Sequence, residues 1–170
     1  MTEQPKTPTR DDLVAALRES GEDFLRRLSA LPAATFEQGR YESGWNGRQI
    51  LAHVAAIEWT YPRLLEIPLQ AQGAPAAGGD PPTRTAQGGI DAYNARQVEK
   101  REGVPVQALL EEFSRNRETT IAAVAGADEG LFAMPIRSAG GVTGPLGLVI
   151  QSVAVGHIIQ HGRDIAGEGG

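Results

Sequence analysis

The stretch DDLVAALRESGEDFLRRLSAL, from Asp11 to Leu31, carries the clearest structural signal in the sequence. Its apolar residues recur every three or four positions, at Leu13, Leu17, Phe24, Leu28 and Leu31, with Ser20 in the remaining place. This spacing is typical of one face of an amphipathic helix. Thr9 or Asp11 can cap the start of this helix, and Pro32 ends it. The pattern indicates an all-α fold.

A second helix is predicted to begin at Asn46, whose side chain can act as its cap. The inward face would carry Ile50, His53, Ile57, Tyr61 and Leu64. Pro62 allows a kink or an early end, and Pro68 is expected to close the segment. One of the three histidines of the chain therefore lies on a face that points to the core.

Two more long helices follow. The first begins at Pro105 and ends at Gly126, with its inner face marked by Leu109, Phe113, Thr120 and Val124. The other runs from about residue 145 to residue 166, and its inner face carries Leu146, Ile150 and Val153. A shorter helix over residues 90–101 has a more polar face.

Two segments between these helices lack any period. Residues 68–89 are rich in proline and glycine and predict a long loop, either solvated or acting as a lid over a site. Residues 134–144 predict a loop or a small hairpin around Gly140 and Gly141. Four long helices around one aliphatic core predict a four-helix bundle that spans residues 1–170 as a single domain, with residues 1–9 and 167–170 frayed.

The composition excludes several classes of function. The 170 residues suit one compact domain, and a net charge of −5 offers no basic surface for nucleic acid. No cysteine is present, which excludes disulfides, thiolate metal ligands and a cysteine nucleophile, and fits a reducing cytoplasm. The N-terminus has no apolar signal region, and no stretch approaches the roughly 18 apolar residues of a membrane span. We therefore expect a cytoplasmic protein with a small-molecule substrate.

The last predicted helix contains the sequence HIIQH, in which His157 and His161 are four residues apart. At about 100° per residue they project within about 40° of each other, so both imidazoles can reach one point. They follow the inner face of their helix, and His53 lies on the inner face of another. Three nitrogen ligands with one open position are typical of a catalytic metal site, and Zn, Ni, Fe or Mn would suit it. Satisfied core histidines are the alternative.

Asp164 lies three residues after His161, on nearly the same face. It can accept a hydrogen bond from a ligand histidine, act as a general base or serve as a fourth ligand. Alternatively it is a solvated carboxylate paired with Arg163. Gln160 and Gln49 are weaker candidates for a hydrogen bond to a metal ligand. Trp45 and Trp59 are expected to pack in the core or at a helix entry rather than to act as stacking platforms. The patterns of zinc proteases, α/β-hydrolases, P-loop proteins and dinucleotide-binding proteins are absent from the sequence.

Two stretches resemble the DinB-like superfamily. GWNGRQILAHVAAIEW, residues 44–59, is similar to its second helix, and GPLGLVIQSVAVGHIIQHGRDI, residues 144–165, is similar to its last helix. The resemblance implies a bundle with up-down-down-up connectivity and a divalent metal held by His53, His157 and His161. Many members of the superfamily are dimers, so the resemblance also implies a homodimer. YNARQVEKREG, residues 93–103, resembles the third helix of the mycothiol-dependent branch.

That superfamily includes mycothiol- and bacillithiol-dependent enzymes, among them a maleylpyruvate isomerase and S-transferases. The leading hypothesis is therefore a metal-dependent enzyme in which a low-molecular-weight thiol such as mycothiol or bacillithiol attacks a small electrophile, with Asp164 or a water managing protons. A metal-dependent hydrolase is one alternative. A metal-binding stress protein without turnover is the other.

Overall fold

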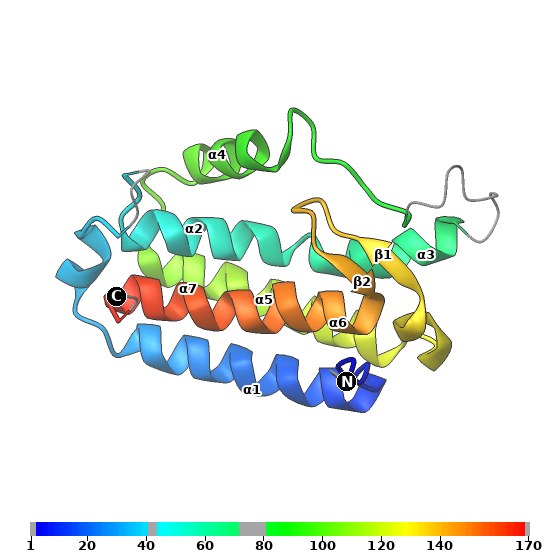
Figure 1. Ribbon diagram of the computed structural model, residues 1–170. Helices are drawn as coiled ribbons and strands as arrows, with labels where there is room; N and C mark the ends of the chain where they lie inside the picture. Colours follow the sequence, from blue (N-terminus) through cyan, green and yellow to red (C-terminus); the bar gives the residue numbers. More distant parts are fainter. Residues whose placement is uncertain (1–2, 41–43, 72–80, 169–170) are drawn as a thin grey trace.

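The computed structural model describes residues 3–40, 44–71 and 81–168, and within them the chain forms a four-helix bundle (Figure 1). The bundle consists of α1 (Arg10–Ser29), α2 (Gly47–Glu58), α5 (Val106–Ala125) and a final helical rod. This rod is α6 (Leu146–Ile150), a π turn called η4 (Gln151–Gly156) and α7 (His157–Ala166). The predicted all-α bundle is confirmed.

The connectivity places parallel helices next to each other. α1 and the final rod run in one direction, and α2 and α5 run in the other, which is the up-down-down-up order (Figure 1). Both α1 and α2 pack against α5 and against α7. A crossover connection between α2 and α5 is therefore needed, and it contains α4 (Ile90–Lys100), which lies outside the bundle against α2.

Side-chain caps determine where α1 and α2 begin. Thr9 accepts a hydrogen bond from the backbone N–H of Asp12, and the Asp12 carboxylate accepts one from the backbone N–H of Thr9. Asn46 and Gln49 form the same reciprocal pair at the start of α2. These bonds satisfy backbone donors that the first turn of a helix leaves without partners. The predicted caps Thr9 and Asn46 are confirmed.

The end of the second predicted helix differs from the prediction. α2 ends at Glu58, and the chain continues through η2 (Tyr61–Leu65) into α3 (Glu66–Ala71). Pro68 was expected to close the segment, but it lies in the first turn of α3, where a missing N–H breaks no helical hydrogen bond. The predicted loop over residues 68–89 therefore begins only after residue 71, and its residues 72–80 lie outside the described part of the chain.

A small hairpin lies beside the final rod. The short turn η3 (Glu129–Ala133) follows α5 and leads into strands β1 (Pro135–Arg137) and β2 (Thr143–Pro145), which pair antiparallel. Another short turn, η1 (Ala33–Glu37), connects α1 to α2. The antiparallel pair confirms the hairpin predicted around Gly140 and Gly141. Arg137 also donates its N–H to the carbonyl of Pro82 at 2.9 Å, which ties the crossover segment to the hairpin.

The core between the four helices is mainly aliphatic. Its largest fully buried side chains include Leu13, Leu17, Ile50, Leu109 and Ile158, together with Phe113 and Phe132. The rings of Phe24 on α1 and Phe113 on α5 pack with centroids 4.7 Å apart, which joins two neighbouring helices. No helix among the described residues is both long and apolar enough to cross a membrane.

Replacing Phe113 by Ala should lower the free energy of unfolding by about 3–5 kcal/mol, because the ring is fully buried and its loss leaves a cavity. Urea denaturation followed by circular dichroism measures this change. Leu69→Ala is the control, since Leu69 on α3 is 52% exposed and its loss should change stability by no more than about 0.5 kcal/mol. Equal losses in the two variants would contradict the placement of Phe113 in the core.

Candidate metal centre

All three histidines of the chain meet at one place between α2 and α7. One possible ligand atom from each of His53, His157 and His161 lies within 4.8 Å of the other two. The ring centroids of His157 and His161 are 4.2 Å apart, and those of His53 and His161 are 5.1 Å apart. Two helices about a hundred residues apart in the sequence thus bring the three predicted ligands together.

His53 is held in place by the local structure of α2. The helix starts at the Asn46 cap, and His53 follows two turns later with only 4% of its surface exposed. The Trp45 ring, just before the cap, packs against the His53 ring with centroids 5.6 Å apart. Trp45 therefore packs at the helix entry, as expected, and forms one wall of the histidine cluster.

The π turn η4 changes which side of the final rod faces the core. In an uninterrupted helix, Val153 and His157 would lie on the inner face with Ile150, but both are only half-buried. Downstream of the turn, the buried residues are Ile158, His161, Gly162 and Ile165. A π turn accommodates one extra residue, and one residue corresponds to a rotation of about 100° around the helix axis. The inner face predicted from Leu146, Ile150 and Val153 did not include this rotation.

Burial keeps the three imidazoles in their neutral form. It lowers the pKa of His53 to about 4, with a smaller contribution from His157 nearby. Burial also lowers the pKa of His161, and the other two histidines lower it further. For His157 burial lowers the pKa, while the Asp164 carboxylate acts in the opposite direction. All three rings are therefore neutral near pH 7, which is the protonation state that a metal ion requires.

The residues present fit a single divalent ion. The Nδ1 atom of His53 is buried and has no hydrogen-bond partner among the described residues, a costly state that coordination would relieve. Two nitrogens bound to one ion at about 2.1 Å lie about 3.4 Å apart in a tetrahedral site. The candidate atoms lie within 4.8 Å of one another, so an approach of no more than about 1.4 Å separates them from that spacing.

Asp164 lies beside the cluster. Its Oδ2 is 3.5 Å from Nδ1 of His161, and its Oδ1 accepts a hydrogen bond from Gln160 Nε2 at 3.1 Å. The carboxylate thus faces a candidate ligand rather than Arg163. Gln49, by contrast, is used in the cap of α2.

Trp59 does not pack in the core, contrary to the expectation. It is 51% exposed, and the guanidinium of Arg63 lies 3.2 Å from its ring centroid. An arginine one helical turn away can stack on an exposed ring, and this contact replaces core packing.

Two buried charged residues were missed by the sequence interpretation. Glu58 on α2 is fully buried, and Arg117 on α5 is 3% exposed, with Arg117 Nε 3.2 Å from Glu58 Oε1. Arg117 lies one turn after Phe113, on the same inner face. The sequence signal that could have revealed this pair was the charged residue Arg117 at an inward-facing position of α5.

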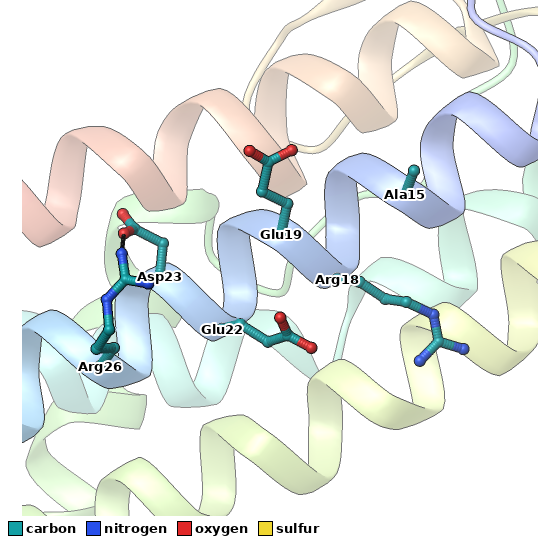
Figure 2. A pocket seen from close by; sticks show the side chains of 6 residues that line it. All are labelled: Ala15, Arg18, Glu19, Glu22, Asp23 and Arg26. Carbon is teal, nitrogen blue, oxygen red and sulfur yellow. Dashed lines mark hydrogen bonds and ion pairs between the residues drawn. The ribbon is translucent and has the colours of Figure 1, made fainter.

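A hollow on the outer surface of α1 is separate from the histidine cluster. It has a volume of about 420 Å³ and is lined by Ala15, Arg18, Glu19, Glu22, Asp23 and Arg26 (Figure 2). Two of these side chains, Asp23 and Arg26, pair with each other. The lining is mostly solvent-exposed and its charges are of both signs, so the hollow offers no concentrated charge for a ligand.

Comparison with known proteins gives a family and a fold. A sequence model of the DinB superfamily matches residues 16–165. The crystal structure of the mycothiol-dependent maleylpyruvate isomerase is similar, with a TM-score of 0.71 and 16% identity over 93% of this chain and 61% of that chain. A histidine-to-alanine mutant of that isomerase has a TM-score of 0.61 and 14% identity over 93% of this chain and 58% of its own. This chain thus spans about three fifths of the isomerase structures. No protein with a curated description matches it.

The depressed pKa of His53 predicts a pH-dependent stability in metal-free protein. Its pKa is about 4 when folded and 6.5 for the free side chain, so the unfolded chain binds more protons between these values. From about pH 7 to about pH 5, wild type should therefore lose roughly 2 kcal/mol more stability than the His53→Gln variant. Urea unfolding in the presence of a chelator measures both proteins. Equal losses would show that His53 is not held neutral.

Proposed function

The chain belongs to the DinB superfamily, and from this membership and its buried histidine cluster we propose that it is a metal-dependent enzyme that uses a low-molecular-weight thiol. The observation that carries the proposal is the meeting of three neutral imidazoles from two helices. Two of them, His53 and His161, are buried, and Nδ1 of His53 has no hydrogen-bond partner among the described residues. Three nitrogen ligands leave one position open for a reactant, as in catalytic sites.

In this proposal His53, His157 and His161 hold one divalent ion, and Zn, Ni, Fe or Mn is compatible with imidazole ligands. When bound, the ion supplies a positive charge that lowers the pKa of a thiol, so that thiolate is present near neutral pH. The protein contributes a largely buried position, since His53 is 4% and His161 5% exposed. His157 is only half-buried and marks the side of the cluster nearest to solvent.

Asp164 orients His161 in this proposal. A hydrogen bond from Nδ1 of His161 to the carboxylate would select the tautomer that carries its lone pair on Nε2. Gln160, one turn before Asp164, holds the other carboxylate oxygen. Because the carboxylate is 14% exposed, it can also exchange a proton with solvent during the reaction.

The choice of a thiol as reactant has support in the fold comparison. The similar structures are those of an isomerase whose title calls it mycothiol-dependent. We therefore propose mycothiol or bacillithiol as the thiol, and isomerisation or S-transfer on a small electrophile as the reaction. We also propose that the protein acts in the cytoplasm as a homodimer.

The ligand assignment predicts a metal content of about one divalent ion per chain in wild type and almost none in His157→Ala or His161→Ala. Asp164→Asn should weaken zinc binding roughly 10-fold, since it alters only the partner of a ligand. Elemental analysis and competition with a chromogenic chelator measure these values. Ile159→Ala changes a 40% exposed side chain of the same helix, so it is the control and should retain the ion. Wild type that never binds a divalent ion would refute the assignment.

The proposed reaction predicts that consumption of a small electrophile requires both metal and thiol. Zinc-loaded protein is mixed with maleylpyruvate or a chromogenic aryl halide, together with mycothiol, bacillithiol, glutathione or no thiol. Consumption should occur only with a thiol and disappear in His161→Ala. Turnover without thiol would instead indicate a hydrolase. Metal binding without any turnover would indicate a binding protein, and either result would overturn the proposal.

A further inference from the structure

The buried pair of Glu58 and Arg117 has no part in the function proposed above. It joins α2 to α5 inside an aliphatic core, with an Arg117 Nε to Glu58 Oε1 distance of 3.2 Å. Removing two charges from water costs several kcal/mol, and apolar side chains in the same place often give equal stability. A contribution to stability therefore does not by itself explain why the pair is present. The hydrogen bond from Arg117 to the backbone of the final rod suggests a more specific role.

The guanidinium of Arg117 reaches the π turn. Its Nη2 donates to the backbone carbonyl of Ala154 at 2.8 Å. The hydroxyl of Tyr61, in η2, donates to the preceding carbonyl, that of Val153, at 2.7 Å. Two consecutive carbonyls of η4 thus accept hydrogen bonds from side chains of other segments.

These two bonds act where the wider π geometry needs support. Within η4 the N–H of His157 bonds to the carbonyl of Ser152, five residues earlier, instead of four. This pattern disturbs the usual pairing of the carbonyls, and side-chain donors can stabilise it. If the turn relaxed to a regular helix, the residues after it would rotate by about 100°. His157 and His161, which follow immediately, would then change their orientation relative to His53 and lose the present arrangement of the cluster.

The position of Arg117 is restricted on other sides as well. A Cβ atom added at Gly21 of α1 would lie 3.1 Å from Arg117 Cγ, so the absent side chain leaves room for the arginine. The guanidinium also lies 5.2 Å from the ring centroid of Phe113. A glycine inside a helix lowers stability by about 1 kcal/mol relative to alanine. The close approach of Arg117 gives a physical reason for glycine at position 21.

We propose that Arg117, held by Glu58 and assisted by Tyr61, is a positioning residue that fixes the π turn and so directs His157 and His161 toward His53. This inference rests on the proposed metal site. Arg117 acts through the backbone carbonyl of Ala154, three residues before His157.

Cobalt binding tests the consequence of this arrangement, because both its affinity and its visible absorption report on ligand geometry. Tyr61→Phe removes only one hydroxyl and should weaken cobalt binding several-fold. The double variant Glu58→Gln, Arg117→Met removes both buried charges and should weaken it roughly 10- to 100-fold with an altered spectrum. Arg117→Lys, which keeps the charge, should fall between wild type and the double variant.

Val124→Ala is the matched control for lost stability. Val124 is buried on α5 about two turns after Arg117. The Val124→Ala substitution should lower the melting temperature of the protein but leave its cobalt affinity and cobalt spectrum as in wild type. If the double variant also keeps both, or if Val124→Ala changes them equally, the positioning role is refuted.

Amide hydrogen exchange on metal-free protein decides the same question without a metal. The inference predicts that Tyr61→Phe and the double variant speed exchange in residues 151–161 more than in α1. Unchanged exchange there would overturn it. Wild type that binds no cobalt would refute the proposed function, whereas the exchange result would still show whether the side chains hold the turn.

Discussion

Three imidazole rings meet between α2 and the final helical rod, two of them buried, and the rest of the structure accommodates this polar cluster. His53 and His161 are 4% and 5% exposed in surroundings that are otherwise aliphatic. Such surroundings keep the rings neutral, as the lowered pKa values show, and leave Nδ1 of His53 without a partner among the described residues. The position of each ring in turn depends on a backbone feature, which is the capped start of α2 for His53 and the π turn for the other two.

The second polar group in the core bears on the same rod. Burial raises the pKa of Glu58 to about 7 and lowers that of Arg117, while each charge opposes the shift of the other. Arg117 and Tyr61 then reach carbonyls just upstream of the histidine pair. The bundle thus combines a polar cluster with the potential to bind an ion and a polar network that supports the helix carrying it. Both lie within a core whose other side chains are mostly apolar.

Local sequence patterns predicted much of the fold and the candidate ligands. Thr9 and Asn46 could be identified as caps because capping depends on residues only three positions apart. The three histidines stood out because inward faces of predicted helices otherwise carried mostly apolar side chains. Predictions failed where a neighbour far along the chain, or an exact backbone position, decided the outcome. Pro68 was compatible with the first turn of α3, and Trp59 stacked with Arg63 in solvent. The inner face predicted for the last helix did not include the rotation at the π turn.

Short-range spacing was enough to predict the helices, their caps and the positions of the candidate histidines, because each of these depends on residues a few positions apart. The meeting of His53 with the other two histidines depends on the packing of the whole bundle, since the up-down-down-up order makes α2 and α7 neighbours. The tertiary structure also decided the rotation of His157 and His161, because the π turn is held by Arg117 and Tyr61 from other parts of the chain. Contacts of that kind depend on three-dimensional proximity, which no local period encodes.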